Sequence, residues 1–479
     1  MDTNALVELI HEVQGQLWVD KMNETHRLGR LCPWVSTFHP DKLSCKLEGA
    51  FHHGAFNAGL KMVFSDNTVW MVRFPRVGKT CDDYTDEKVA MEVAALGLIR
   101  EKTAIPVPRV RAWGPAASNP LGLGPLSDLL RDPNAERPSR LMREDISGHD
   151  VETIYRQMAG IMLQLFKVDF DQIGSLPPPP LKQAHCSTSL PRPLTFKAHS
   201  ILQNGGVNTF GDRTKGFATT TEYFQYVVGQ DWEQLVHQPN SVCGEYDAQN
   251  KYVALKALRS FVPDLVHPKY NHGNFKLICD DFGLANLIVH SKDDLTVVGV
   301  IDLEWTYIGP AQLFGSAPWW LLQDRPVNSA WDYNGEEPPE IAARSPGHEE
   351  KELSSLVKWS QESRAMWLHL LLSSSFNDHR SFPFTKLRQH FGADGWAKRE
   401  KEFDCAGEME AFASRKVGEL DKYDEDLEQI EENKALMDNG RMTKEEFILA
   451  AAAIIESRSS SSSTVNDELS SDKVLYHMP

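Results

Sequence analysis

One stretch in the second half of the chain constrains its fold most, because its pattern is that of a hairpin with polar residues at both ends. Residues 287–289 are apolar, residues 291–294 form a polar turn, and residues 295–301 are rich in β-branched side chains. Two such runs around a polar turn predict two antiparallel strands. Since the open ends of a hairpin meet, Asn286 before it and Asp302 after it are expected to lie close together.

The polar residues at the open end of this hairpin fit the requirements of kinase-type phosphoryl transfer. That chemistry uses a carboxylate beside the acceptor hydroxyl, together with an Asn and an Asp that hold magnesium on the phosphates. Asp281 lies five residues before Asn286, as in the kinase catalytic loop, although Cys279 stands where that loop has His. Magnesium prefers a few hard oxygen ligands plus waters and phosphate oxygens, so Asn286 and Asp302 suffice as protein ligands.

The N-terminal part of the chain contains a second element of the same chemistry. A turn with Gly49 and Gly54 precedes two strand-like runs, at residues 60–64 and 69–74. In kinases such a turn lays backbone N–H groups over the nucleotide phosphates, and the returning strand supplies a cation to them. Arg73, on the second run, is placed to be that cation, and Arg can pair phosphate oxygens bidentately. The turn around Gly49 and Gly54 is therefore expected to cover the phosphates.

A helix is predicted over residues 84–103, because apolar side chains recur there at helical spacing and share one face. Glu92 lies beside that face. It is the candidate partner of Arg73, as a helix glutamate is for the phosphate-binding cation of kinases. Residues 105–108, Ile-Pro-Val-Pro, then return the chain to an extended course, since Pro disfavours helix in the residue before it.

These segments together resemble the aminoglycoside phosphotransferase-like family, and especially its fungal members. The resemblance is carried by residues 279–286, 301–310 and 317–322 in the second half of the chain, and by residues 92–94 and 105–108 in the first half. It implies a protein kinase-like α+β fold with two lobes, a small β-rich N-lobe and a larger α-rich C-lobe.

The resemblance also implies roles for the polar residues. Asp281 would be the catalytic carboxylate, and Asn286 and Asp302 would be the metal ligands. Arg73, braced by Glu92, would steady the phosphates of the nucleotide. The implied reaction is magnesium-dependent transfer of the γ-phosphoryl group of ATP or GTP to a hydroxyl of a small molecule.

The chain is expected to divide into four parts. Residues 1–44 form a helical N-terminal extension, and residues 45–125 form the nucleotide-binding N-lobe. Residues 126–455 form the α-rich C-lobe with the catalytic loop and the metal site. Residues 456–479, rich in Ser, form a disordered tail, because their composition offers too little apolar surface to bury.

The hinge between the lobes is where the sequence departs from the family. Residues 114–140 contain no run of β-type residues, although a hinge strand that hydrogen-bonds the adenine is expected there. This departure, with Cys279 in the His position, leaves an alternative open. The alternative is a catalytically degenerate, kinase-like binding protein. A protein kinase is a weaker alternative, because no Ala-Pro-Glu segment follows Asp302.

Composition limits the partners of the chain. The 479 residues carry a formal net charge of −17, which argues against nucleic acid as a general partner. The 7 cysteines include no C-x-x-C pair, so zinc and thioredoxin-type chemistry are not expected and a reducing, cytoplasmic location is the simpler interpretation. No apolar run is long enough to span a bilayer, so no membrane association is expected either.

Overall fold

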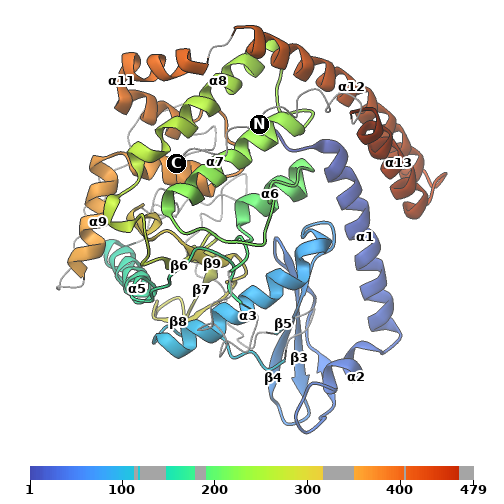
Figure 1. Cartoon of the computed structure of the whole chain (residues 1–479). Helices are drawn as coiled ribbons and strands as arrows, with labels where there is room; N and C mark the ends of the chain where they lie inside the picture. The colour runs from blue at the N-terminus through green and yellow to red at the C-terminus, as the bar shows by residue number, and fades with distance from the viewer. Residues whose placement is uncertain (113–116, 119–146, 178–189, 317–349, 404–405, 463–479) are drawn as a thin grey trace.

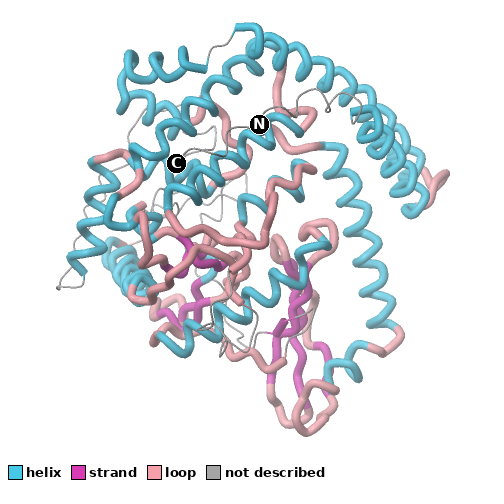
Figure 2. Tube along the Cα trace, in the orientation of Figure 1, coloured by secondary structure: helices cyan, strands magenta, loops and turns pink. Residues whose placement is uncertain are grey.

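The computed structural model describes residues 1–112, 117–118, 147–177, 190–316, 350–403 and 406–462. The chain forms two lobes, a small strand-rich lobe and a larger helical lobe, so the predicted two-lobed α+β architecture is confirmed (Figure 1). Figure 2 shows the strands in two separate groups, one in the small lobe and one inside the helical lobe. Among the described helices, none combines the length and hydropathy needed to cross a bilayer.

The small lobe is built on an antiparallel sheet in which β3 and β4 are the central strands. Apolar side chains alternate along both strands and bury one face, which packs against α2 (Leu31–Ser36). The predicted strands at residues 60–64 and 69–74 correspond to β3 and β4. The strands, in chain order, are β1 (Cys45–Leu47), β2 (His52–His53), β3 (Asn57–Phe64), β4 (Val69–Pro75) and β5 (Ala117–Ser118).

Helix α3 (Thr85–Lys102) packs between the lobes and matches the helix predicted over residues 84–103. Its apolar face belongs to the core of the large lobe, which continues through Met91, Ala95 and Ile99. Two charged residues of this helix, Lys88 and Glu92, are also buried. Because charged side chains are rarely buried unless they are paired, α3 brings ionic partners to the interface of the lobes.

The large lobe is mostly helical and contains two short two-stranded sheets. Strand β6 (Lys276–Cys279) pairs with β9 (Thr306–Gly309), and β7 (Leu287–Val289) pairs with β8 (Val297–Val300), all antiparallel. The predicted hairpin after Asn286 is therefore present. The helices of this lobe are α5 (Gly148–Phe166), α6 (Phe196–Gly205), α7 (Thr220–His237), α8 (Glu245–Phe261), α9 (Glu350–Glu362), α10 (Ala365–Ser373) and α11 (Phe382–Phe403).

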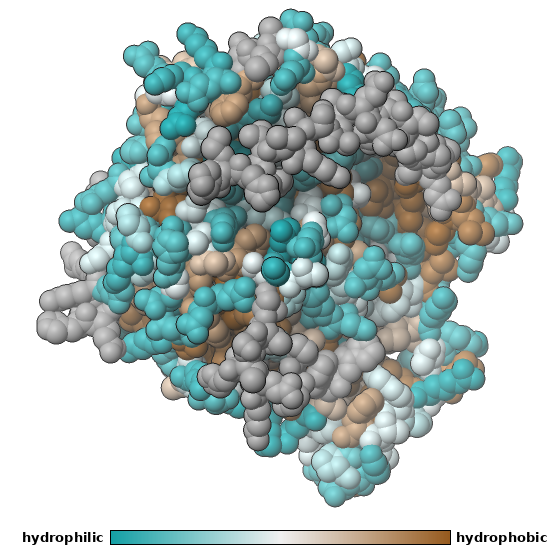
Figure 3. All heavy atoms as spheres, in the orientation of Figure 1, coloured by the Kyte–Doolittle hydropathy of each residue, from teal (hydrophilic) through white to brown (hydrophobic). Residues whose placement is uncertain are grey.

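Helix α1 (Ala5–Arg27) runs from the large lobe to the small lobe along one side of the molecule (Figure 1). It packs with α12 (Ala406–Asp438) and α13 (Lys444–Ser462) around a small apolar core of their own. Figure 3 shows hydrophobic side chains gathered at the edge where these helices lie. Helix α1, in the predicted helical N-terminal extension, thus contacts both lobes.

Two predicted segments, the hinge between the lobes and the C-terminal tail, are only partly covered by the described residues. At the hinge, β5 pairs with β4 over two residues, Ala117 with Arg73 and Ser118 with Val72. The rest of the expected hinge, residues 114–116 and 119–140, lies outside the described residues. At the C-terminus, helix α13 continues to Ser462, past residue 456 where the tail was expected to begin, and its apolar residues up to Ile454 pack on α1 and α12.

Candidate active site

Two loops meet at the open end of the hairpin between β7 and β8. One is the segment from Asp280 to Asn286, which follows β6, and the other runs from Ile301 to Trp305, before β9. Backbone hydrogen bonds join them, because Asp280 N–H donates to the Trp305 carbonyl at 3.1 Å and Ile301 N–H donates to the Asn286 carbonyl at 2.9 Å. The pairing of the strands therefore sets the two loops side by side.

Asn286 and Asp302 present an amide and a carboxylate on the two adjacent loops. The Asn286 side chain is buried and its Nδ2 donates to the Asp281 carbonyl at 2.6 Å, which directs its Oδ1 away from that bond. Asp302 has a positive φ of 61°, a conformation that Asp adopts more readily than most residues. Its side chain is 34% exposed and turns towards the small lobe. An amide oxygen and a carboxylate on adjacent loops suit magnesium.

Arg73 links β4 to α3 and to the Asp302 loop. Its Nη1 donates to Glu92 Oε1 at 2.7 Å, and its Nη2 donates to Asp302 Oδ1. A third carboxylate, that of Glu304, lies 3.9 Å from Nη2. Although burial lowers the pKa of the Arg73 guanidinium, the three carboxylates outweigh burial and raise that pKa above its ordinary value. The side chain is therefore a fixed positive charge.

A second buried ion pair lies beside the first. Lys88 Nζ is 2.5 Å from Glu304 Oε2, and both side chains are only 2% exposed. Asn57 Nδ2, from the start of β3, donates to the same Glu304 oxygen at 2.6 Å. The Lys88 ammonium also lies 5.5 Å from the centre of the Trp305 ring. Glu304 thus receives contacts from two elements of the small-lobe side.

Burial controls the ionisation of this cluster. Desolvation raises the pKa of Glu304 to about 7, and the neighbouring Lys88 ammonium limits that rise. His199 of α6 packs on Trp305, and burial together with the Lys88 charge lowers the pKa of His199 to about 3. His199 is therefore neutral and accepts a hydrogen bond from Cys81 N–H at 3.1 Å. The charged side chains at the interface of the lobes therefore pair mainly with one another.

The loop that carries Asp281 is anchored through its neighbours. Asp280 Oδ2 accepts a hydrogen bond from Phe196 N–H at 3.1 Å, at the start of α6. The buried hydroxyl of Tyr307 contacts Asp280 and accepts a hydrogen bond from the Tyr223 hydroxyl at 3.0 Å. Cys279 is partly buried opposite Thr306 across the β6–β9 ladder, and desolvation raises the pKa of its thiol. Asp280 therefore ties the loop that carries Asp281 to the start of α6 and to Tyr307.

The glycine turn lies on β3 in a closed form. Gly49 has a positive φ of 79°, which favours glycine, and β2 pairs back onto β3 between the two glycines. Gly54 N–H donates to the Asn57 carbonyl at 2.8 Å, and the Gly54 carbonyl accepts from Arg76. The Gly54 N–H and carbonyl are therefore both engaged within the small lobe.

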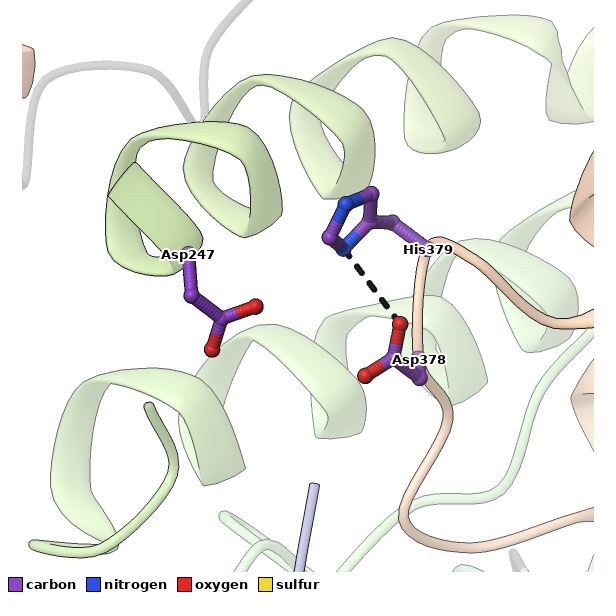
Figure 4. Close-up of side chains that lie close together, drawn as sticks. All are labelled: Asp247, Asp378 and His379. Carbon is purple, nitrogen blue, oxygen red and sulfur yellow. Dashed lines mark ion pairs between the residues drawn. The ribbon is translucent and has the colours of Figure 1, made fainter. Parts of the chain in front are cut away.

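Another cluster of possible metal ligands lies far from these loops. Asp247 of α8, with Asp378 and His379 before α11, brings three ligand atoms within 4.8 Å of one another (Figure 4). Its carboxylates are already neutralised, because Lys251 Nζ lies 2.7 Å from Asp247 and Arg380 Nη2 lies 2.8 Å from Asp378. Asp247 Oδ1 has no hydrogen-bond partner in the described part of the chain, yet the nearby cations disfavour a further divalent ion.

The sequence predicted a site of Asp281, Asn286, Asp302, Arg73 and Glu92. In the structure Arg73 of β4 contacts Glu92 of α3 and Asp302, and Asn286 bonds the backbone of Asp281 on the adjacent loop. Sequence reasoning missed Lys88, Glu304, Asn57 and Asp280. For Lys88 a signal existed, because it lies four residues before Glu92 and shares its helix face. For the others no local signal exists, since each acts through contacts with residues far away in the sequence.

No protein-family model matches this sequence, and no curated protein matches it. Among solved structures, macrolide 2'-phosphotransferase type I is similar at 12% identity and a TM-score of 0.37, covering 75% of this chain and 92% of its own. A macrolide 2'-phosphotransferase from Brachybacterium faecium is similar at 12% identity and a TM-score of 0.35, over 78% and 96% of the two chains. A proposed fructosamine-3-kinase from Thermobifida fusca shares 14% identity at a TM-score of 0.32, over 78% and 95%.

Proposed function

We propose that this protein is a magnesium-dependent phosphotransferase of the aminoglycoside phosphotransferase-like type. It moves the γ-phosphoryl group of ATP or GTP to a hydroxyl of a small molecule. The observation that carries the proposal is the chain of contacts in which Arg73 of β4 bonds Glu92 of α3 and Asp302, while a backbone hydrogen bond joins the Asp302 loop to Asn286. Kinase-type phosphoryl transfer relies on positioning and charge, and these residues supply both.

Each polar residue has one task in this proposal. Asp281 orients the acceptor hydroxyl and takes its proton late in a loose transition state. Asn286 Oδ1 and the Asp302 carboxylate hold magnesium, which when bound supplies positive charge to the phosphate oxygens. Arg73 steadies the phosphates, and Glu92 keeps its guanidinium in position. In this proposal the two adjacent loops carry the catalytic and metal-binding residues, and β4 with α3 carries the residues that face the phosphates.

The metal and nucleotide site is tested by thermal-shift titration of ATP and GTP, with and without magnesium. Wild type is compared with Asp302→Ala and with the matched control Asp293→Ala, an exposed carboxylate in the turn of the same hairpin. A ligand at about a hundred times its Kd stabilises a protein by about 2.7 kcal/mol. A magnesium-dependent rise in melting temperature is expected for wild type and Asp293→Ala, and its loss for Asp302→Ala. Equal stabilisation of all three would contradict the metal assignment.

The catalytic assignment is tested by Asp281→Asn. Loss of a positioned general base lowers turnover by about 10²–10⁴-fold, whereas the variant retains the atoms that hold the nucleotide. We therefore expect magnesium-dependent stabilisation by the nucleotide to persist while phosphoryl transfer to water or to an acceptor is lost. Turnover at the wild-type rate would refute the role of Asp281.

A non-catalytic nucleotide-binding protein is the second candidate. Two contacts favour it: the guanidinium of Arg73 is engaged with Asp302, and the N–H of Gly54 is engaged within its own turn. The same titration separates the candidates when it is combined with a phosphate-release assay. The binding protein would be favoured if the nucleotide stabilises the chain but no phosphate release depends on Asp281, so that wild type and Asp281→Asn give the same result.

A further inference from the structure

The large lobe contains a pocket beside the catalytic loop. Its volume is about 150 Å³. Cys279, Asp280 and Phe282 form one wall, and they flank Asp281 in the chain. The other walls come from α5, from the 3₁₀ turn Ala311–Gly315 and from the end of α10. The pocket thus adjoins the residue proposed to meet the acceptor hydroxyl.

The lining of this pocket is mostly apolar, and His369 is the largest polar group in it. Burial lowers the pKa of His369 to about 3, so its imidazole is neutral. Its Nε2 accepts from Gln312 Nε2 at 2.8 Å, and its Nδ1 donates to Ser316 Oγ at 2.6 Å. Ser373 Oγ donates to the Leu370 carbonyl at 3.1 Å. Covering a polar atom with an apolar ligand costs free energy when that atom loses its hydrogen-bond partner. Because each of these groups already has a partner within the protein, an apolar ligand avoids this cost.

The carboxylate in the wall is also engaged. Asp280 accepts a hydrogen bond from Phe196 N–H and contacts the Tyr307 hydroxyl. Its charge lies at the first turn of α6, where the helix N-terminus stabilises an anion. The pocket consequently presents no uncommitted negative charge to a ligand ammonium group, and recognition of a polycationic acceptor inside it is not expected.

We infer that this pocket holds an uncharged apolar group of the acceptor alcohol, about as large as one six-membered ring. The inference rests on the proposed function, because it assigns the acceptor of the same site. The size follows from volume, since a cavity of about 150 Å³ lined by Leu, Ile and Phe takes up benzene in another protein. The apolar part of the acceptor fills the pocket, and its hydroxyl emerges next to Asp281.

The experiment uses fluorine NMR with para-fluorobenzyl alcohol as the probe, on the full chain without nucleotide. One matched compound tests the chemistry: trifluoroethanol is also a fluorinated alcohol but lacks the ring. Binding of the aromatic alcohol, with binding at least about tenfold weaker for trifluoroethanol, is expected because the contacts of the ring with the pocket are lost. Equal binding of the two compounds would overturn the inference.

Two substitutions change the pocket in opposite directions. Ser373→Leu fills it, and we expect at least about a tenfold loss of affinity for the aromatic alcohol. Leu370→Ala enlarges it, and we expect naphthylmethanol, too large for wild type, to bind this variant. The control is Ser355→Leu, the same change at an exposed position of α9, which should bind the probe as wild type does. If the Leu variant at Ser373 does not fold, the enlarged pocket still decides, because general damage cannot create binding of a larger ligand.

The outcome is distinguishable from failure of the proposed function. Probe binding is measured without nucleotide, whereas the phosphotransferase proposal is tested by magnesium and ATP. Binding of the probe to a protein that ignores magnesium and ATP would support the pocket and refute the transferase. Stabilisation by magnesium and ATP without binding of the aromatic alcohol would support the transferase and overturn the assignment of its acceptor.

Discussion

The buried pair of Lys88 and Glu304 offers a quantitative test of how the lobes are joined. The substitution Lys88→Met keeps the length and burial of the side chain but removes its charge. The two charged groups are 2.5 Å apart and 2% exposed, so the change leaves a carboxylate buried beside Asn57 and 3.9 Å from Arg73. Breaking a buried ion pair by removing one partner costs about 3–5 kcal/mol.

The size of this loss depends on pH through Glu304. The pKa of Glu304 in the folded protein, about 7, lies above its ordinary value of 4.5. The folded protein therefore binds this proton more tightly than the unfolded chain, and the resulting stability is fully present at pH values below 4.5. That contribution, about 3 kcal/mol, is lost as the pH rises through the folded pKa. Without the Lys88 ammonium the folded pKa rises further. The variant should therefore lose about 3–5 kcal/mol at pH about 8 and less than half of that at pH about 5.

The assay is urea unfolding followed by tryptophan fluorescence at both pH values. Lys102→Met, on the exposed end of the same helix, is the matched control and should change stability by less than about 0.5 kcal/mol. The double substitution Lys88→Met with Glu304→Gln should recover most of the loss at high pH, because no charge is then left buried alone. A loss of equal size at both pH values, without recovery in the double variant, would show that packing and not charge is responsible.

Two further substitutions test the surroundings of the site. Tyr307→Phe removes the hydroxyl that meets Tyr223, and it should cost about 1–2 kcal/mol in urea unfolding because a buried partner is left without its hydrogen bond. Gly78→Ala should cost more than about 1 kcal/mol in the same measurement, since Gly78 has a φ of 76° and an added Cβ would stand 2.0 Å from the His11 carbonyl of α1. The exposed Tyr246→Phe and Gly418→Ala are the respective controls, and equal effects of test and control would contradict both explanations.

The elements that position the site could be predicted because their signals are local. The hairpin after Asn286 is marked by two β-branched runs and a polar turn, and helix α3 by apolar residues at helical spacing. Both features depend on residues within a few positions of one another, so a single sequence contains them. The contact of Arg73 with Glu92 joins residues 19 positions apart, and it was predicted from the resemblance to kinases and not from a local pattern.

The remaining features of the site depend on distant contacts. Glu304 is an acidic residue two positions after Asp302, and nothing near it in the sequence reveals that Lys88 and Asn57 bury it. Asp280 occupies a position where the backbone of α6 meets the catalytic loop, which only the packing of the lobe determines. Local sequence patterns therefore do not predict which charged residues are buried and paired, because this depends on tertiary contacts.

Under the proposed function, the position of Arg73 predicts a positive coupling between metal and nucleotide binding. Its guanidinium now contacts Asp302, the residue proposed to hold magnesium, so phosphates that attract the guanidinium release the carboxylate for the metal. Magnesium in turn neutralises Asp302 and frees the guanidinium for the phosphates, while Glu92 retains the other side of Arg73. Each ligand thus removes a cost of binding the other, which is a positive coupling. In calorimetric titrations the affinity for ATP should rise with magnesium more in wild type than in Asp302→Asn, whereas equal gains in both proteins would mean that the exchange of partners does not occur.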